Sequence, residues 1–326
     1  MDHTRLLSAP PIIKDFLTYS EIIKGKSAKT VTEYYLDLQT FFRYILLIRG
    51  LTEPNTPFEK ISIEKVDLTL IKSISMSDLY AFLVYCKEER GNNTTTRARK
   101  TSTLRIFFRY LTNYVHLLEQ NPAELLETPK IRQALPKHLT LENSIALLDA
   151  VDGPYKERDY CILTLFLNCG LRLSELCGLD VTDIRPDGNM RVLGKGNKER
   201  IVYLNDACMD AIRSYMAVRP QDQLKANDRN ALFISRQHKR ISNKTVQHLV
   251  KSYLEAAGLG GQGYSTHKLR HTAATLMYQH GNVDIRVLKD LLGHANLGTT
   301  QIYTHVSDRQ IKKAVDANPL ASHKKK

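Results

Sequence analysis

The sequence predicts a mainly helical protein of two domains, the second of which contains a small antiparallel β-sheet. Apolar residues recur at three- and four-residue spacing in several segments, whereas residues 191–204 alternate between apolar and polar. A stretch rich in proline and charge divides the chain, whose 326 residues suit two domains of roughly 100–200 residues each. We therefore expect a helical N-terminal domain at 1–126, a linker at 127–138 and a second domain at 139–326.

Three helices are expected in the first domain. The first covers Thr30 to Ile48, where apolar side chains form one face. The second follows Ser77 as its N-cap and runs through Lys87. Residues 51–75, with two prolines and no clean period, predict a long connection between these helices. The third covers 94–118, with an apolar stripe of Leu104, Phe107, Phe108, Leu111, Tyr114 and Val115.

The second domain is expected to contain several helices and one β segment. Gly194, Gly196 and Asn197 interrupt the alternating residues 191–204, as in a β-hairpin or a short three-stranded sheet. A further short helix is expected at 308–315, before a lysine-rich tail. The other expected helices are 141–150, 160–169, 206–218, 243–257, 266–280 and 284–292.

The charge balance favours a polyanionic partner. The formal net charge is +13 and the pI is about 9.4, with a basic excess in both halves. Basic residues gather without any acidic one between Arg90 and Leu118. A solvated helix face is the alternative, but such faces usually mix signs. We therefore expect contacts with a DNA backbone from Arg97, Arg99, Lys100 and Arg105.

Several protein classes fit the composition poorly. No apolar run approaches the ~18 residues that a membrane-spanning helix needs. The N-terminal residues do not form an export signal, so a cytoplasmic protein is expected. Five cysteines without a CxxC pair predict reduced core residues in place of disulfides or a zinc site.

Four segments of the second domain carry the functional signal. They are GLRLSEL, GKGNKERIVYL, STHKLRHTAATLM and LLGHANLGTTQIYTHVS, which begin at residues 170, 194, 265 and 291. In content, order and spacing these segments resemble the tyrosine recombinases, most closely the bacterial Xer type. The resemblance extends from Leu139 to the end of the chain. It implies a helical core-binding (SAM-like) domain followed by a catalytic domain of the DNA-breaking-rejoining fold.

The resemblance assigns the phosphate-binding role to Arg172 and Arg270. A phosphodiester under attack gains negative charge on its non-bridging oxygens, so the site needs fixed positive donors there. Arginine fits because its planar fork bonds two oxygens and stays charged at any working pH. Glu175, three residues after Arg172, is expected to support that arginine without taking part in the chemistry.

The same resemblance makes Tyr303 the nucleophile, attached through its oxygen to a 3′ phosphate of DNA in the intermediate. Ionising a tyrosine at pH 7 costs roughly 4 kcal/mol, so a base and a positive field are needed. His267 is the expected general base, and it shares a helix face with Arg270. Lys195, between two glycines, is the expected general acid for the leaving 5′ oxygen, and His294 the expected hydrogen-bond donor to the phosphate.

Alternative assignments for two of these residues were weighed. Tyr264 lies close before His267 and is the best rival nucleophile, but it falls in a glycine-rich turn that the family does not use. A zinc helix built on His267 and His271 would need the glutamate of an HExxH motif, and Lys268 stands there instead. Because arginines supply the charge and the phosphotyrosine conserves the bond energy, we expect no metal, ATP or other cofactor.

The expected partner is double-stranded DNA carrying a specific recombination site, bound by a homotetramer or heterotetramer on two duplexes. Dimer resolution of the Xer kind is the favoured role. No arm-binding domain is expected before Leu6, which supports this role, whereas the long connection at 51–75 leaves the subfamily open. A mobile-element integrase, a type IB topoisomerase-like enzyme and a non-catalytic DNA-binding protein are the rivals. The need for a second recombinase or an accessory protein is left open.

Overall fold

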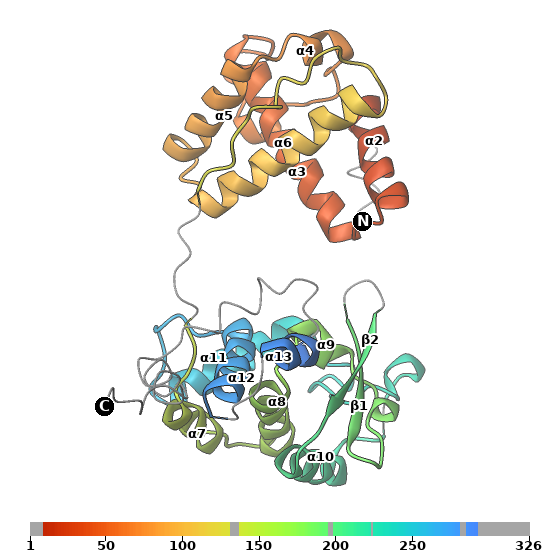
Figure 1. The fold of residues 1–326 in the computed structure, drawn as a ribbon, viewed down its shortest axis with the longest axis vertical. Coiled ribbons are helices and arrows are strands. Elements are labelled where there is room, and N and C mark those ends of the chain that lie inside the picture. Colours follow the sequence, from red (N-terminus) through yellow and green to blue (C-terminus); the bar gives the residue numbers. More distant parts are fainter. Residues whose placement is uncertain (1–8, 131–136, 195–197, 223, 281–284, 293–326) are drawn as a thin grey trace, which may run out of the picture. The chain divides into compact units, whose positions relative to one another are not determined.

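The computed structural model describes residues 9–130, 137–194, 198–222, 224–280 and 285–292 (Figure 1). The chain divides into two compact units, which we call unit 1 (Met1–Gln133) and unit 2 (Ala134–Lys326). Helices dominate both units, and the named strands of the described residues form one two-stranded sheet in unit 2. The predicted fold class is therefore confirmed.

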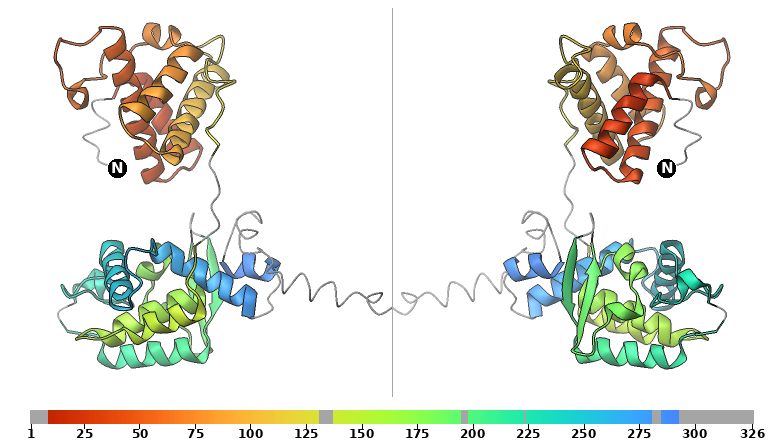
Figure 2. Two further views of the ribbon diagram at one scale, coloured as in Figure 1. Left: turned by 90° about the vertical axis from the view of Figure 1, so that its left-hand side faces the viewer. Right: turned by 90° about the vertical axis from the view of Figure 1, so that its right-hand side faces the viewer.

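Unit 1 is built around the long helices α3 (Ala28–Ile48), α5 (Met76–Glu88) and α6 (Thr94–Asn113), which pack pairwise against one another (Figure 2). Shorter elements flank them: α2 (Pro11–Thr18), the π-helix η1 (Tyr19–Ile23), the 3₁₀-helix η2 (Phe58–Lys60) and α4 (Leu68–Lys72). Buried phenylalanines fill the centre in edge-to-face contacts, such as Phe41 with Phe82 and Phe16 with Phe107. These contacts join helices that lie far apart in the sequence.

Two helix ends in unit 1 differ from the predicted ones. The second helix begins two residues earlier than predicted, because Ser75 accepts from the Asp78 amide and the Asp78 carboxylate accepts from Ser75 in return. The third ends at Asn113, where the backbone turns and the next residue, Tyr114, is half exposed. The prediction that the helix continues to Leu118, with Tyr114 and Val115 in its apolar stripe, was therefore wrong.

The predicted connection at 51–75 folds onto unit 1 instead of looping away from it. It contains η2 and α4, and it buries Ile61, Ile63 and Val66 in the core. These isoleucines and valine are spaced at two and three residues, so they form neither a helical nor a strand pattern. Tertiary packing therefore orders a segment that has no period of its own.

Unit 2 packs around α8 (Lys156–Cys169), whose residues are buried on nearly all sides. It lies against α10 (Asp206–Val218) and α12 (Thr266–His280), as Figure 1 shows. The remaining helices are α7 (Leu141–Asp149), α9 (Leu173–Gly178), α11 (Asn243–Ala256), α13 (Ile285–Leu292) and the 3₁₀-helices η3 (Val181–Asp183) and η4 (Ala226–Asp228). Most of these bounds match the predicted helices, but α8 begins at Lys156 and not at the predicted Tyr160, and the helix predicted at 308–315 lies outside the described residues.

The β segment is a hairpin of β1 (Asn189–Leu193) and β2 (Glu199–Tyr203). The strands are antiparallel, and Val192 lies opposite Arg200. One face packs Met190 and Val202 into the core, while the other presents Tyr203 to solvent. Of the two predicted alternatives the hairpin is correct, extended by a single bridge between Ile184 and Met190.

Two further predictions concern the whole chain. All five cysteines are free and buried, as expected for reduced core residues. Among the described residues, no helix is both long enough and apolar enough to span a bilayer.

Candidate active site

Arg172 and Glu175 lie where the chain leaves α8 and enters α9. Gly170 ends α8 with a left-handed φ of 58°, which favours glycine, and Arg172 is the N-cap residue of α9. Glu175 accepts the Arg172 backbone N–H at 2.8 Å and its Nη1 at 2.7 Å. The Glu175 side chain is 2% exposed and that of Arg172 is 36% exposed. A buried carboxylate therefore orients an arginine that still reaches the surface.

Arg270, on α12, lies close to Glu175 as well. Its Nη1 donates to the Gly170 carbonyl and its Nη2 to the Leu292 carbonyl, each at 2.6 Å. The Arg270 Nη1 also lies 3.8 Å from Glu175 Oε2. Two arginines that are 98 positions apart in the sequence thus converge on one carboxylate.

Arg200, on β2, is a third arginine at this carboxylate and was not among the site residues predicted from the sequence. Its Nη1 and Nη2 donate to the two Glu175 oxygens at 2.8 and 2.9 Å, and its Nε donates to the Leu291 carbonyl at 3.2 Å. The available signal was its inward position in an alternating strand, where a charged residue requires a buried partner.

These contacts keep Glu175 ionised. Burial by itself raises the pKa of the Glu175 carboxyl, but hydrogen bonds from Arg200 and from the Arg172 backbone, together with the Arg200 charge, lower that pKa to about 2. At neutral pH the site therefore holds one fixed negative charge among three positive ones.

His267 lies one turn before Arg270 on α12, at the surface. Its Nε2 is 3.1 Å from the Nε2 of His271, so one ring donates and the other accepts. Partial burial of the ring lowers the pKa of His267 from its ordinary 6.5. The positive charges of Lys268, Arg270 and Arg172 lower that pKa further. His267 is accordingly neutral at pH 7, the state a general base requires.

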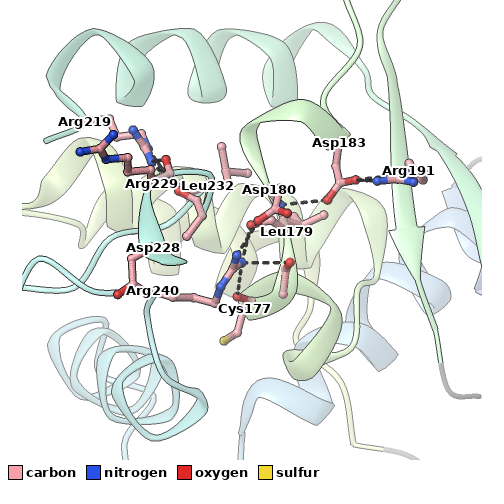
Figure 3. Close-up of polar contacts among 12 residues, drawn as sticks. Cys177, Leu179, Asp180, Asp183, Arg191, Arg219, Asp228, Arg229, Leu232 and Arg240 are labelled. Carbon is pink, nitrogen blue, oxygen red and sulfur yellow. Dashed lines mark hydrogen bonds and ion pairs between the residues drawn. The ribbon is translucent and has the colours of Figure 1, made fainter. Parts of the chain in front are cut away.

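The α9 helix is fastened at its other end by a separate set of arginine contacts (Figure 3). Arg240 donates to the carbonyls of Cys177, Gly178 and Leu179 at 3.3, 3.0 and 2.9 Å, and it pairs with Asp180. These contacts satisfy carbonyls that a helix end leaves without partners. Polar contacts thus hold both ends of α9, the buried Glu175 at its start and the partly exposed Arg240 at its end.

Three predicted site residues, Lys195, His294 and Tyr303, lie outside the described residues. Their roles stay predictions. The hairpin end next to Lys195 is described: the Gly194 N–H donates to the Lys198 carbonyl at 2.8 Å. A Cβ atom on Gly194 would lie 3.7 Å from Glu175 Oε1, so this end of the hairpin borders the arginine cluster.

Of the four basic residues expected to contact DNA from unit 1, Arg99 and Lys100 pair with the buried Asp37, although Arg99 itself is exposed. Lys100 is buried and its Nζ donates to Asp37 at 3.0 Å, and Thr103 donates to Asp37 at 2.9 Å. Arg99 pairs with the same carboxylate at 2.7 Å and with Glu33 at 2.8 Å. Core packing explains Lys100 without any DNA contact.

The other two are placed differently along α6. Arg97 donates to the Asn92 carbonyl at the start of the helix and is partly buried. Arg105 is exposed, and it borders a surface hollow together with Arg109. Of the four, Arg105 is best placed to meet an external phosphate.

The alternative nucleophile, Tyr264, and the alternative zinc site both fall in unit 2. Tyr264 packs against the unit 2 core, with the Lys137 Nζ 5.0 Å from its ring centroid. Among the described residues, no group of three or more His, Cys, Asp or Glu side chains is arranged to hold a metal ion.

Comparison with protein families matches the chain twice. The "Phage integrase family" model covers residues 137–310, more than half of the chain, and the "Phage integrase, N-terminal SAM-like domain" model covers residues 58–114. The chain belongs to the phage integrase family. Within this family it is of the Xer type of tyrosine recombinase, as the curated relatives show.

One such relative is the tyrosine recombinase XerC of Caldanaerobacter subterraneus subsp. tengcongensis, 51% identical over 97% of this chain and 88% of the relative. Another is the tyrosine recombinase XerD of Proteus mirabilis, 36% identical over 92% of this chain and 90% of the relative. The solved structure of XerH site-specific recombinase bound to difH substrate has the same fold, with a TM-score of 0.67, 23% identity, and 94% and 83% of the two chains covered.

Proposed function

We propose that this chain is a site-specific tyrosine recombinase that cleaves and rejoins double-stranded DNA through a 3′-phosphotyrosyl intermediate. The convergence of Arg172 and Arg270 on Glu175, with His267 one turn before Arg270 on α12, is the observation that carries the proposal. A pair of buried or half-buried guanidinium groups next to a neutral base suits an anionic substrate whose charge grows during reaction. The homology to recombinases named XerC and XerD supports the same activity.

The reaction follows from the proposed roles. The Tyr303 oxygen attacks the phosphorus as His267 takes the phenolic proton, while Arg172 and Arg270 stabilise the charge on the non-bridging oxygens. The bond from phosphorus to the 5′ oxygen breaks, and Lys195 protonates that oxygen. His294 hydrogen-bonds the phosphate. The new phosphotyrosine bond conserves the energy of the broken one, so the reverse attack by a 5′ hydroxyl reseals the strand without ATP.

Unit 1 is proposed to bind the DNA backbone. Arg105 is exposed on α6, and Arg97 and Arg99 lie on the same helix. Affinity from such contacts falls steeply with salt, because each neutralised phosphate releases bound counterions. We do not include Lys100 in this surface, because it is buried against Asp37.

The biological role that we propose is resolution of chromosome or plasmid dimers by a homotetramer or heterotetramer on two duplexes. Exchange between two duplexes needs four active sites, used two at a time. We expect residues after Val306, which lie outside the described residues, to dock on a neighbouring subunit. Integration of a mobile element uses the same chemistry and is the alternative.

The test is covalent trapping on a nicked suicide duplex carrying the resolution site of the source genome. Wild-type protein is expected to give a shifted band on a denaturing gel, and Tyr303→Phe none. A band that persists in Tyr303→Phe contradicts the nucleophile assignment. Trapping on element ends alone favours the integrase alternative, and relaxation of supercoils without recombinants favours a topoisomerase-like activity.

A further inference from the structure

Arg200 bonds both carboxylate oxygens of Glu175 with its side chain. Its two terminal nitrogens bond the two carboxylate oxygens at 2.8 and 2.9 Å, and the side chain is only 13% exposed. Arg172 donates to Oε1 with its side-chain Nη1 and to Oε2 with its backbone N–H, and the Arg270 Nη1 lies 3.8 Å from Oε2. The pairing of Arg200 with Glu175 is thus a two-point contact inside the protein, which is the strongest geometry for such a pair.

Glu175 presents an electrostatic problem for a site that must bind phosphate. A carboxylate orients Arg172, but its negative charge also repels the phosphate and neutralises the arginine that it orients. The three guanidinium groups and one carboxylate carry a net charge of +2 in all. Without Arg200 that charge falls to +1, and Arg172 and Arg270 would be the remaining partners of the carboxylate among these groups.

We propose that Arg200 is a positioning residue that neutralises Glu175, so that Glu175 orients Arg172 without cancelling its charge toward the substrate phosphate. The proposal rests on the proposed function, because it concerns the arginines assigned there to the phosphate. Arg200 acts through Glu175 and does not touch the substrate.

Arginine is required at this position by the geometry. Its fork meets both carboxylate oxygens while its Nε donates to the Leu291 carbonyl at the end of α13. Arg270 donates to the next carbonyl, that of Leu292. A lysine could supply the charge but only one point of contact, so it cannot join β2, α9 and α13 at once.

A double-mutant cycle between Arg200 and Glu175 tests this role through single-turnover cleavage of the suicide duplex. Arg200→Gln is expected to slow cleavage at least about tenfold when Glu175 is present. In the Glu175→Gln background, Arg200→Gln should cost less than about threefold, because no carboxylate remains to be neutralised. DNA affinity should change far less than the cleavage rate, because most phosphate contacts of a bound duplex lie outside this site. Equal losses in both backgrounds overturn the proposal, since a purely structural arginine would give that result.

Arg191→Gln is the matched control. It removes an arginine from the same hairpin, but Arg191 pairs with Asp183 and Glu199 on the exposed face. Its cleavage rate should equal that of wild type. If Arg200→Gln does not fold, Arg200→Met, which also removes the positive charge, takes its place in the same cycle, and its loss of rate must again depend on the presence of Glu175.

A second measurement requires no cleavage. Inorganic phosphate is titrated into the full chain while the side-chain N–H signals of Arg172 and Arg270 are followed by NMR. Arg200→Gln should weaken phosphate binding at least about threefold, and addition of Glu175→Gln should restore it. Unchanged binding in Arg200→Gln overturns the proposal. A wild-type chain that binds phosphate here but forms no covalent complex contradicts only the proposed recombinase function.

Discussion

Replacing Glu175 with glutamine tests how much the buried carboxylate stabilises unit 2. The pKa of this carboxyl is lowered from 4.5 to about 2 in the folded protein. A difference of this size corresponds to roughly 3 kcal/mol of unfolding free energy at neutral pH. Because the folded pKa is the lower one, this stabilisation is fully present above pH 4.5. It is lost as the pH falls toward 2.

The pH dependence gives the sharper measurement. By pH 3.5 the carboxylate should have lost roughly 1.4 kcal/mol of its contribution, since the unfolded chain is mostly protonated there and the folded chain is not. Glutamine does not titrate, so the difference in unfolding free energy between wild type and Glu175→Gln should shrink by that amount between pH 7 and pH 3.5. Urea unfolding, followed by amide exchange of peptides from α8, reports on unit 2 specifically.

One result would refute this reasoning. If the difference between wild type and Glu175→Gln is the same at pH 7 and pH 3.5, the arginine contacts do not stabilise the ionised form. Glu175→Gln would then act only through packing. A Glu88→Gln variant serves as the control, because that carboxylate is exposed in unit 1 and should leave the unfolding of unit 2 unchanged.

Two further predictions concern other charged groups. Asp37→Asn should destabilise unit 1 by about 3–5 kcal/mol, because it leaves Lys100 buried without its anionic partner; a loss under 1 kcal/mol in urea unfolding would contradict this. Lys268→Gln should raise the pKa of His267, since the Lys268 charge helps to lower it. In the pH profile of the cleavage rate, the acid limb should therefore move to higher pH. If the acid limb does not move, His267 is not the general base.

Much of this protein could be predicted from local sequence pattern. The helix at Thr30 to Ile48 and the hairpin around Gly194 follow from apolar residues that recur with periods of 3.6 and 2. These periods come from the geometry of helices and strands and do not depend on what the element packs against. The motif residues Arg172 and Arg270 were also found from sequence, because their neighbours are distinctive. The helix end at Asn113 was not, since it depends on how the chain turns after the last helical residue.

The sequence by itself determined the family, the helical character of both units and the residue types of the site. Tertiary structure alone decided which charges meet. Asp37 captures Lys100 from 63 positions away, which turns an expected DNA contact into a core ion pair. Arg200 joins Glu175 across 25 positions because β2 aims it inward. The sequence alone does not show whether a charged residue faces solvent or a buried partner, because that depends on the folded structure.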